Sequence, residues 1–288
     1  MYKIVILGCE NSHADNFLKL ISAGNYPDIE VIGVYSNEPE AAARLNDKFG
    51  VYVMKSYDEM LGKVDGIMVT ARHGDNHYKY AKPYMDSGIP MFIDKPITCS
   101  EEDSVAFMKE AKEKQIRFCG GSTCAALAET LELMNAVKEN AAGELRGGSI
   151  ACPIQLESPY GGFFFYAQHL VEVMLTVFGE DINAVTANKY DGYLTFTAHY
   201  EAFDVMATYI EKLPYYTVSL YGSKASMLRN LTFTSESFRH EMSDMLDLLN
   251  GMPMKKSYES FVLPVFVMNS IVRSVESGKR EKVERPII

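Results

Sequence analysis

The sequence predicts an α/β protein, with a doubly wound parallel sheet at the N-terminus and an α+β domain with a mostly antiparallel, open-faced sheet after it. Short apolar runs alternate with helical patterns up to about residue 120, which is typical of parallel strands with crossover helices. Several strand-like runs then follow one another. The length of 288 residues and 47% hydrophobic content allow two domains. We place them at residues 1–120 and 121–288.

In the first half of the sequence, predicted strands alternate with predicted helices. Apolar, β-branched runs predict strands, and segments with helical periodicity between them predict helices. Pro39 near the start and Gly50 after the end frame one of these helices, and another is expected to close at Gly88 despite Pro83. The expected strands are 3–7, 29–36, 64–71, 90–96 and 116–121, and the expected helices are 12–24, 37–50, 77–88 and 100–114.

The second half contains successive runs rich in β-branched and aromatic residues, which favour strands. Asp191-Gly192 between two of them indicates a hairpin. One sheet face should pack on helices, and alternation leaves aromatic and aliphatic side chains on the other, so we expect a homodimer or a dimer of dimers. The expected strands are 149–157, 182–190, 193–200, 203–211 and 215–222, and the expected helices are 125–140, 168–179 and 257–278.

Composition restricts the partners and the compartment. The formal net charge of -10 argues against nucleic acid or an anionic membrane surface, because both require clustered Lys and Arg. The five cysteines have no C-x-x-C pair, so we expect neither disulfides nor a zinc site, and a cytoplasmic location fits. The longest apolar stretch near the end is interrupted by Pro264 and Asn269, so no membrane span is expected.

The opening "ILGCENSHA" places a glycine turn between an apolar strand and a helix. This is where a nucleotide-binding fold holds pyrophosphate, against N–H groups at the helix N-terminus. The pattern G-x-G-x-x-G would need glycine at 8, 10 and 13, whereas the chain has Gly8, Glu10 and His13, so the motif is weak. Glu10 would repel phosphate unless its side chain points away or is neutralised. Ser12 is the expected N-cap, and Asn11 completes the phosphate-facing loop.

The stretches "VTARHGDNHYKYAKPYMDSGIPMFIDKP" and "YAQHLVEVMLTVFG" make the argument specific. His77 stands 17 positions before "DKP" at 94–96, and His169 and Glu172 match an H-x-x-D helix pattern with a conservative change. With "YGSKASMLRN" as a weaker third match, the chain resembles the Gfo/Idh/MocA oxidoreductases over nearly its whole length. The resemblance implies a Rossmann domain that binds NAD or NADP and hydride transfer to or from a small polar substrate, such as a sugar or cyclitol.

The resemblance also implies roles for site residues. Lys95 is the first choice for the group that exchanges the hydroxyl proton, since partial burial would bring the pKa of a lysine toward neutrality. His169 is the second, either as donor to the substrate oxygen or as base. Asp94 would bind the nicotinamide ribose, and the cofactor contacts extend to Thr70, Ala71 and His77.

One expected residue is missing. The family's aspartate would fall four positions before His169, where this chain has Phe165 within an aromatic run. Either Tyr166 or Gln168 supplies the polar contact, or the catalytic set is reduced and the reaction differs from polyol oxidation. The aromatic run is either plain packing or, with Tyr160 and Tyr166, the lining of a pocket for a ring substrate.

Cofactor choice is read at the end of the second strand, where an acidic residue would bind the ribose 2′-OH and favour NAD. The chain has Ser36 and Asn37 there, so NADP is allowed and slightly favoured. The preference is weak because the nearest arginine, Arg44, lies along the following helix.

Two alternatives remain open. A metal could be held by carboxylates and imidazoles near the strand ends, but no short paired spacing supports it, and no metal is expected. The residues concerned are Glu10, His13, His73, Asp75 and His77. The second alternative is a non-catalytic, dinucleotide-responsive binding or regulatory protein on the same fold. The missing aspartate and Glu10 favour it, whereas Lys95 and His169 favour the enzyme.

Overall fold

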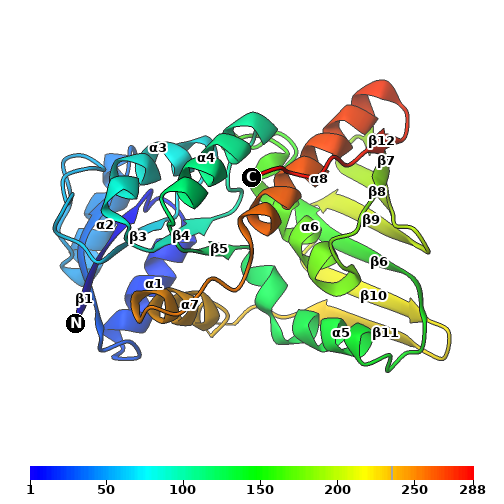
Figure 1. The fold of residues 1–288 in the computed structure, drawn as a ribbon, viewed down its shortest axis with the longest axis horizontal. Coiled ribbons are helices and arrows are strands. Elements are labelled where there is room, and N and C mark those ends of the chain that lie inside the picture. The colour runs from blue at the N-terminus through cyan, green and yellow to red at the C-terminus, as the bar shows by residue number, and fades with distance from the viewer. Residues whose placement is uncertain (235) are drawn as a thin grey trace. The chain divides into compact units, whose positions relative to one another are not determined.

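The computed structural model describes residues 1–234 and 236–288 and divides the chain into two compact units (Figure 1). The first unit contains residues 1–121 together with 236–261 and Ile288. The second contains residues 122–234 and 262–287. The first division falls beside the domain boundary expected at 120/121. The return of residues 236–261 to the first unit was not predicted.

The first unit is built on a five-stranded parallel sheet with the order β2-β1-β3-β4-β5. The chain leaves β1 to one side for β2 and then crosses to its other side for β3, so the order reverses beside β1. Such a switch point opens a ligand-binding crevice at the carboxyl ends of the strands. The strands are β1 (Tyr2–Leu7), β2 (Ile29–Tyr35), β3 (Gly66–Val69), β4 (Met91–Asp94) and β5 (Phe118–Gly121).

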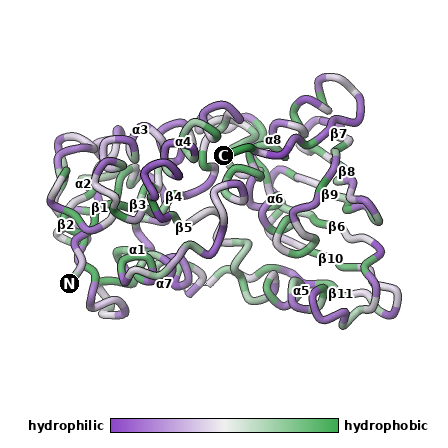
Figure 2. The backbone as a smooth tube through the Cα atoms, in the orientation of Figure 1, coloured by the Kyte–Doolittle hydropathy of each residue, from purple (hydrophilic) through white to green (hydrophobic). Residues whose placement is uncertain are grey.

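Apolar strands between helix layers give this unit its core. The central strands are buried on both faces, as expected of a parallel sheet, and they lie within hydrophobic stretches coloured green in Figure 2. The helix expected to close at Gly88 is an α-helix followed by a 3-10 helix that contains Pro83. The helical elements are α1 (Ser12–Ser22), α2 (Pro39–Phe49), α3 (Asp75–Ala81), η1 (Lys82–Ser87), α4 (Glu101–Glu113) and α7 (Arg239–Leu249).

Helix α7 belongs to the first unit although it follows the second sheet in sequence. Its residues Met242, Met245 and Leu248 are buried in one hydrophobic cluster with side chains of β1, α1 and β4. The contact is close, since a Cβ on Gly66 would lie 2.5 Å from the Met245 Cε. Helix α7 therefore completes the core of the five-stranded sheet.

The second unit is built on a seven-stranded sheet with the order β11-β10-β6-β9-β8-β7-β12. The β6–β9 pair is parallel and the other pairs are antiparallel, which confirms a mostly antiparallel sheet. The strands are β6 (Leu145–Ile154), β7 (Ala184–Tyr190), β8 (Tyr193–His199), β9 (Asp204–Glu211), β10 (Tyr216–Gly222), β11 (Ser226–Leu231) and β12 (Glu281–Lys282). The last two were not predicted as strands.

Helix α6 covers one face of this sheet at short range. A Cβ on Gly148 of β6 would lie 2.2 Å from the Phe178 ring, so only glycine allows the observed approach. The helix begins at Phe164, four residues before the expected start at 168. The helical elements are η2 (Thr123–Ala126), α5 (Ala128–Lys138), α6 (Phe164–Phe178) and α8 (Tyr258–Ser277), whose first four residues are assigned to the first unit.

Among the helices of the described residues, none combines the length and the apolar character that crossing a membrane requires.

Candidate functional site

The glycine turn after β1 has a steric cause. Gly8 adopts φ +80°, and a Cβ there would lie 2.4 Å from the Ala71 Cα. The Thr70 hydroxyl donates to the Gly8 carbonyl at 3.0 Å, and the N–H groups of Gly8 and Cys9 donate to the Tyr35 carbonyl. The loop is therefore fixed at the carboxyl ends of three neighbouring strands.

Helix α1 starts directly after this loop. Asn11, not Ser12 as predicted, is the N-cap, and its side chain accepts the His13 backbone N–H at 2.8 Å. The bonds inside a helix do not use the N–H groups of its first turn, and the macrodipole makes this end electropositive. Ser12, the first residue of α1, is exposed. The backbone N–H donors at this end of the helix therefore suit an anionic group. Together with the close backbone approach at Gly8, this fits the pyrophosphate of a dinucleotide.

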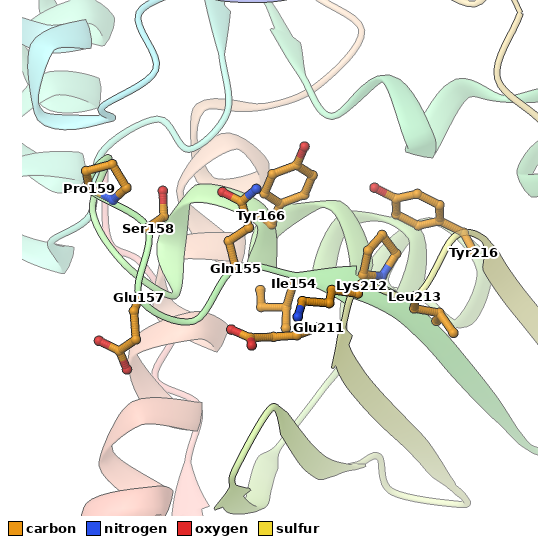
Figure 3. Close-up of a pocket in the computed structure, with 11 residues that line it drawn as sticks. Ile154, Gln155, Glu157, Ser158, Pro159, Tyr166, Glu211, Lys212, Leu213 and Tyr216 are labelled. Atoms are coloured by element: carbon orange, nitrogen blue, oxygen red, sulfur yellow. The ribbon is translucent and has the colours of Figure 1, made fainter.

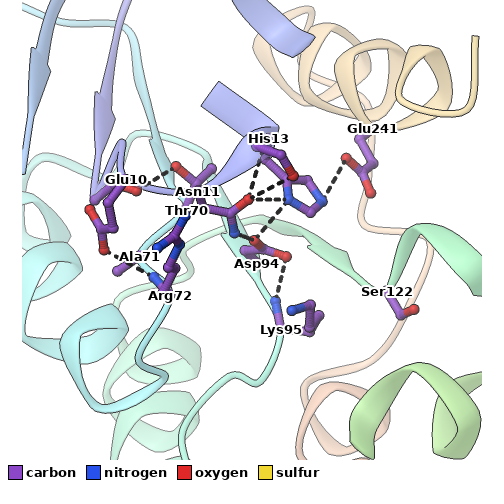
Figure 4. A network of polar contacts seen from close by, with 12 residues as sticks. Glu10, Asn11, His13, Thr70, Ala71, Arg72, Asp94, Lys95, Ser122 and Glu241 are labelled. Atoms are coloured by element: carbon purple, nitrogen blue, oxygen red, sulfur yellow. Dashed lines mark hydrogen bonds and ion pairs between the residues drawn. The ribbon is translucent and has the colours of Figure 1, made fainter. Parts of the chain in front are cut away.

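The Glu10 side chain turns away from the α1 N-terminus toward the end of β2. It is 6% exposed; its Oε2 atom accepts from the Ser36 hydroxyl at 2.7 Å, and its Oε1 atom accepts from the Arg72 backbone N–H at 3.0 Å. This is the outward orientation that the sequence required of a carboxylate in the loop. Figure 4 shows it apart from the His13 and Asp94 side chains.

Asp94, the last residue of β4, is fully buried and binds the same loop from the other side. Its Oδ2 atom accepts from the Asn11 side-chain amide at 2.7 Å and lies 3.2 Å from His13 Nδ1. Its Oδ1 atom accepts from the Lys95 backbone N–H at 2.7 Å. The carboxylate thus connects the loop after β4 with the N-terminus of α1 (Figure 4).

His13 lies between two carboxylates. Its Nδ1 atom faces Asn11 Oδ1 at 2.8 Å as well as Asp94, and its Nε2 atom lies 3.7 Å from Glu241 Oε2 on α7. Burial alone lowers the pKa of the imidazole, but Asp94 and then Glu241 raise it further than burial lowers it, so the net shift is upward. Both ring nitrogens face acceptors, which suits the protonated form.

His77 is fully buried on α3. Its Nδ1 and Nε2 atoms lie 2.7 Å from the Pro96 carbonyl and 2.9 Å from the Ala71 carbonyl. Burial lowers the pKa of this ring further than Asp94 and the two carbonyl contacts raise it. His77 therefore shapes two loops at the sheet edge, and a direct cofactor contact stays a prediction.

Lys95 follows β4 and is 5% exposed. The Lys95–Pro96 peptide is cis, and the Lys95 backbone N–H is held by Asp94. The lysine is thus anchored through its backbone at the carboxyl edge of the parallel sheet.

Asn37, the remaining predicted cofactor residue of the first unit, is exposed in the turn after β2.

His169 lies in the second turn of α6, not at its start as predicted. Its Nδ1 atom is 2.7 Å from the Ser122 hydroxyl, which also accepts the Cys124 backbone N–H at 3.2 Å. Glu172 accepts from the Ser122 backbone N–H at 2.9 Å and also from the Gln168 amide. Sequence reasoning missed Ser122, whose only signal was its place directly after the last strand of the first sheet.

Gln168 is 1% exposed, and its Oε1 atom has no hydrogen-bond partner within the described residues. A buried amide oxygen without a donor is uncommon in folded proteins. Because this atom is buried, a substrate contact of Gln168 stays a prediction.

A pocket of about 590 Å³ lies in the second unit (Figure 3), and His169 does not line it. The rings of Tyr166 and Tyr216 line it, and their centroids lie 5.6 and 6.2 Å from the His169 ring. Burial raises the pKa of the Tyr216 hydroxyl, which therefore stays a donor near pH 7. The lining also includes Gln155, Ser158, Glu211 and Lys212. Sequence reasoning named only Tyr166 among these residues.

The remaining aromatic residues form a group at the start of α6. The Phe165 ring packs 5.3 Å from Tyr160 and 4.9 Å from Tyr166. The position where an aspartate was expected thus contributes packing, and of this group only Tyr166 lines the pocket.

The residues considered for a metal do not form one group. Glu10, His13 and His77 are bound as described above, whereas ligand atoms of His73, Asp75 and Cys99 lie within 4.8 Å of one another. Burial and the neighbouring Asp75 raise the pKa of the Cys99 thiol to about 12, so it is protonated near pH 7. The prediction of no bound metal stays a prediction.

The fold and loop described here define a dinucleotide-binding Rossmann domain. The model of the Gfo/Idh/MocA oxidoreductase family, with an NAD-binding Rossmann fold, matches residues 2–121, and this part of the chain belongs to that family. The resemblance drawn from the sequence is confirmed. The protein is an NAD(P)-dependent oxidoreductase of the Gfo/Idh/MocA type.

Solved structures with the same two-domain fold cover nearly the whole chain. A myo-inositol dehydrogenase from Corynebacterium glutamicum superposes with a TM-score of 0.84 at 16% identity over 99% of each chain. GenD2 from gentamicin A biosynthesis, in complex with NAD, gives 0.87 at 15% identity over 98% of this chain and 96% of its own. A scyllo-inositol dehydrogenase from Lactobacillus casei gives 0.85 at 14% identity over 98% of each chain. None of the curated proteins matches the sequence.

Proposed function

We propose that the protein is a dehydrogenase or reductase that exchanges a hydride with a CH–OH carbon of a small polyhydroxylated ring, such as a cyclitol or sugar. The observation that carries the proposal is the pocket of the second unit, whose wall contains Tyr166 and Tyr216, the two tyrosines that contact the His169 ring. Its volume of about 590 Å³ suits a small molecule.

The chemistry of the lining supports a polar ring. Aromatic faces pack against the C–H face of a sugar or cyclitol, whereas hydroxyl and amide groups bind its equatorial oxygens. Tyr216, Gln155 and Ser158 offer such groups. Lys212, which is exposed at the pocket, adds an ammonium group that favours a hydroxyl or carboxylate oxygen. The dehydrogenases with the same fold act, by their names, on inositols.

The nicotinamide cofactor supplies the hydride acceptor or donor when bound. The protein must then hold the cofactor, orient the carbinol carbon and accept the proton that leaves the hydroxyl oxygen. We assign the proton to Lys95 Nζ, since the Lys95 backbone is held rigidly by Asp94. We assign orientation of the substrate oxygen to His169, whose Nδ1 atom is held by Ser122.

The cofactor assignment rests on the first unit. We propose that the pyrophosphate lies over residues 8–13, where the N-terminus of α1 offers backbone donors. The adenosine ribose would lie beside Ser36 and Asn37, and Thr70 and Ala71 would form the floor of the loop. Asp94 would orient Lys95 and contact the nicotinamide ribose.

The test is a panel of inositols, hexoses and sugar acids with NAD and NADP, followed by the absorbance of the reduced cofactor. Turnover of a ring polyol that is lost in Tyr166→Ala but kept in Tyr190→Ala, an exposed tyrosine outside the pocket lining, would support the proposal. Tight dinucleotide binding without turnover of any substrate would favour the alternative of a non-catalytic binding protein. Phe165 in place of the aspartate supports that alternative.

Homodimers or dimers of dimers remain part of the proposal. The second sheet leaves Met206 on β9 and Leu228 on β11 56% and 57% exposed. Apolar side chains on a sheet face are usually covered by another chain in stable oligomers. A second copy of this chain is the partner that we propose.

A further inference from the structure

We propose that Glu10 takes the place of the acidic residue that usually ends the second strand of a dinucleotide-binding domain, and that it makes this protein selective for NAD over NADP. The proposal rests on the cofactor site described above. It reverses the slight preference for NADP that the sequence suggested.

The position of the carboxylate is the first argument. In Rossmann domains an Asp or Glu at the end of β2 accepts a hydrogen bond from the 2′-OH of the adenosine ribose. Here Ser36 follows β2, and the carboxylate comes instead from the glycine loop, with Glu10 Oε2 2.7 Å from the Ser36 hydroxyl. A negative charge therefore stands at the expected place although no acidic residue occupies it in the sequence.

The contacts of the carboxylate leave it able to bind ribose. Within the described residues, Oε2 accepts from Ser36 and Oε1 accepts from the Arg72 backbone, whereas a carboxylate oxygen is able to accept two hydrogen bonds. The Ser36 hydroxyl in turn accepts the Glu38 backbone N–H at 3.0 Å, so the whole group is fixed to the β2–α2 turn. Such pre-organisation favours a diol, which donates to the carboxylate.

A 2′-phosphate would meet the same carboxylate and be repelled. Arg44, the arginine that could have bound the phosphate, forms an ion pair with Asp15 on α1, and Lys48 binds the same carboxylate at 2.8 Å. Arg72 is another cationic residue near this place, since its backbone N–H contacts Glu10. The Arg72→Ala variant therefore tests whether its side chain binds a 2′-phosphate.

Nicotinamide fluorescence titration with NADH, NADPH and 2′-deoxy-NADH tests the proposal without any substrate. We expect the wild-type protein to bind NADH at least about tenfold more tightly than either analogue, since loss of a charge-assisted hydrogen bond has that effect. In Glu10→Gln the affinities for NADH and NADPH should differ by no more than about threefold. Glu40→Gln, which removes an equal charge from an exposed position on α2, should keep the wild-type ratio.

The outcomes separate the two levels of the assignment. An unchanged ratio in Glu10→Gln, or wild-type preference for NADPH that is lost in Arg72→Ala, overturns the role of Glu10 and leaves the nucleotide site intact. Binding of neither dinucleotide by the wild-type protein overturns the site itself. If Glu10→Gln does not fold, as judged by thermal denaturation, equal wild-type affinity for NADH and 2′-deoxy-NADH still overturns the proposal.

Discussion

His13 Nδ1 lies 3.2 Å from Asp94 Oδ2, so the N-terminus of the first helix is ion-paired to the end of the fourth strand beneath the nucleotide loop. Glu241 stands on the other side of the ring, at 3.7 Å from Nε2. The positive charge of the imidazole therefore separates two buried carboxylates. The His13 ring thus connects three segments that are distant in sequence.

This relationship predicts a pH dependence of stability. Because the folded-state pKa of His13 is raised above about 6.5, its contribution to the free energy of unfolding is full below pH 6.5 and is lost as the pH rises through the folded-state pKa. His13→Gln should cost about 3 kcal/mol at pH 6 and less at pH 9. Denaturant unfolding of both proteins from pH 6 to 9 measures the difference.

The free energies of unfolding of the two proteins must be subtracted at each pH, because His77 changes stability with pH in the opposite direction to His13. Its pKa is lowered by burial, so the stability that it contributes is lost as the pH falls below its unfolded-state value. This contribution is common to both proteins and cancels. A difference between wild type and His13→Gln that does not change with pH would contradict the protonated state assigned to His13.

Gly8 and Gly24 offer a matched pair for testing the nucleotide loop. Both have positive φ, +80° and +78°, but a Cβ on Gly24 would meet nothing within 4 Å, whereas one on Gly8 would collide with Ala71. We expect Gly24→Ala to cost about 1 kcal/mol, the usual effect of a left-handed φ. Gly8→Ala should cost more and weaken NADH binding, and Gly8→Val should abolish it.

Differential scanning calorimetry and NADH titration of these variants separate backbone strain from the steric contact. Equal effects of the two alanine substitutions on NADH affinity would show that the approach of Gly8 to Ala71 does not position the loop. The unfolding of the second unit should not change in either variant.

Lys95 is expected to transfer the proton. Once a substrate is found, Lys95→Ala should lower kcat by about a hundredfold or more, the usual scale for a lost general acid or base, with NADH affinity changed only a few fold. Lys95→Arg keeps the charge but cannot release a proton near neutral pH, so it should be equally inactive. Steady-state kinetics with near-normal turnover in Lys95→Ala would remove the main reason for assigning catalysis to this residue.

His169 should be less critical if it only orients substrate. His169→Asn would then lower kcat by about tenfold, against a hundredfold if it is the base. Ser122→Ala removes the hydroxyl that holds the ring, so it should raise KM or shift the pH profile of kcat without abolishing turnover. An unaltered pH profile and KM in Ser122→Ala would show that the hydrogen bond has only a structural role.

The exposed face of the second sheet predicts self-association. Met206→Glu places a charge among its exposed apolar groups and should shift the protein toward monomer in light scattering at micromolar concentration. Leu61→Glu, at a 42% exposed site in the first unit, is the control and should leave the molar mass unchanged. A monomeric wild-type protein would contradict the predicted dimer.

The alternating strands and helices of the first unit could be predicted because each buried parallel strand is a continuous apolar run. Helix α7 could not, because its three inward side chains pack on β1, α1 and β4, which lie 150 positions or more earlier in the sequence. Strand β11 was missed for another reason. It lies at the edge of the sheet, and exposed side chains alternate along it with half-buried ones.

The site divides in the same way. Lys95, Asp94 and His169 are candidates from the sequence because their motifs are local, and their roles stay predictions. The destination of the Glu10 carboxylate depends on pairing between strand ends, and Tyr216 and Lys212 enter the pocket from another strand and its turn. Such neighbours follow from tertiary packing, which no single stretch of sequence encodes.

The return of residues 236–261 to the first unit bears on how the gene can be divided. A fragment that ends at Gly121 would retain all five parallel strands, yet it would lack Met242, Met245 and Leu248, the side chains that cover its core. It would also lose the carboxylate opposite His13. When the two halves are exchanged between related enzymes, residues 236–261 should therefore be transferred together with the first 121 residues. A hybrid protein without them would expose an apolar surface and precipitate.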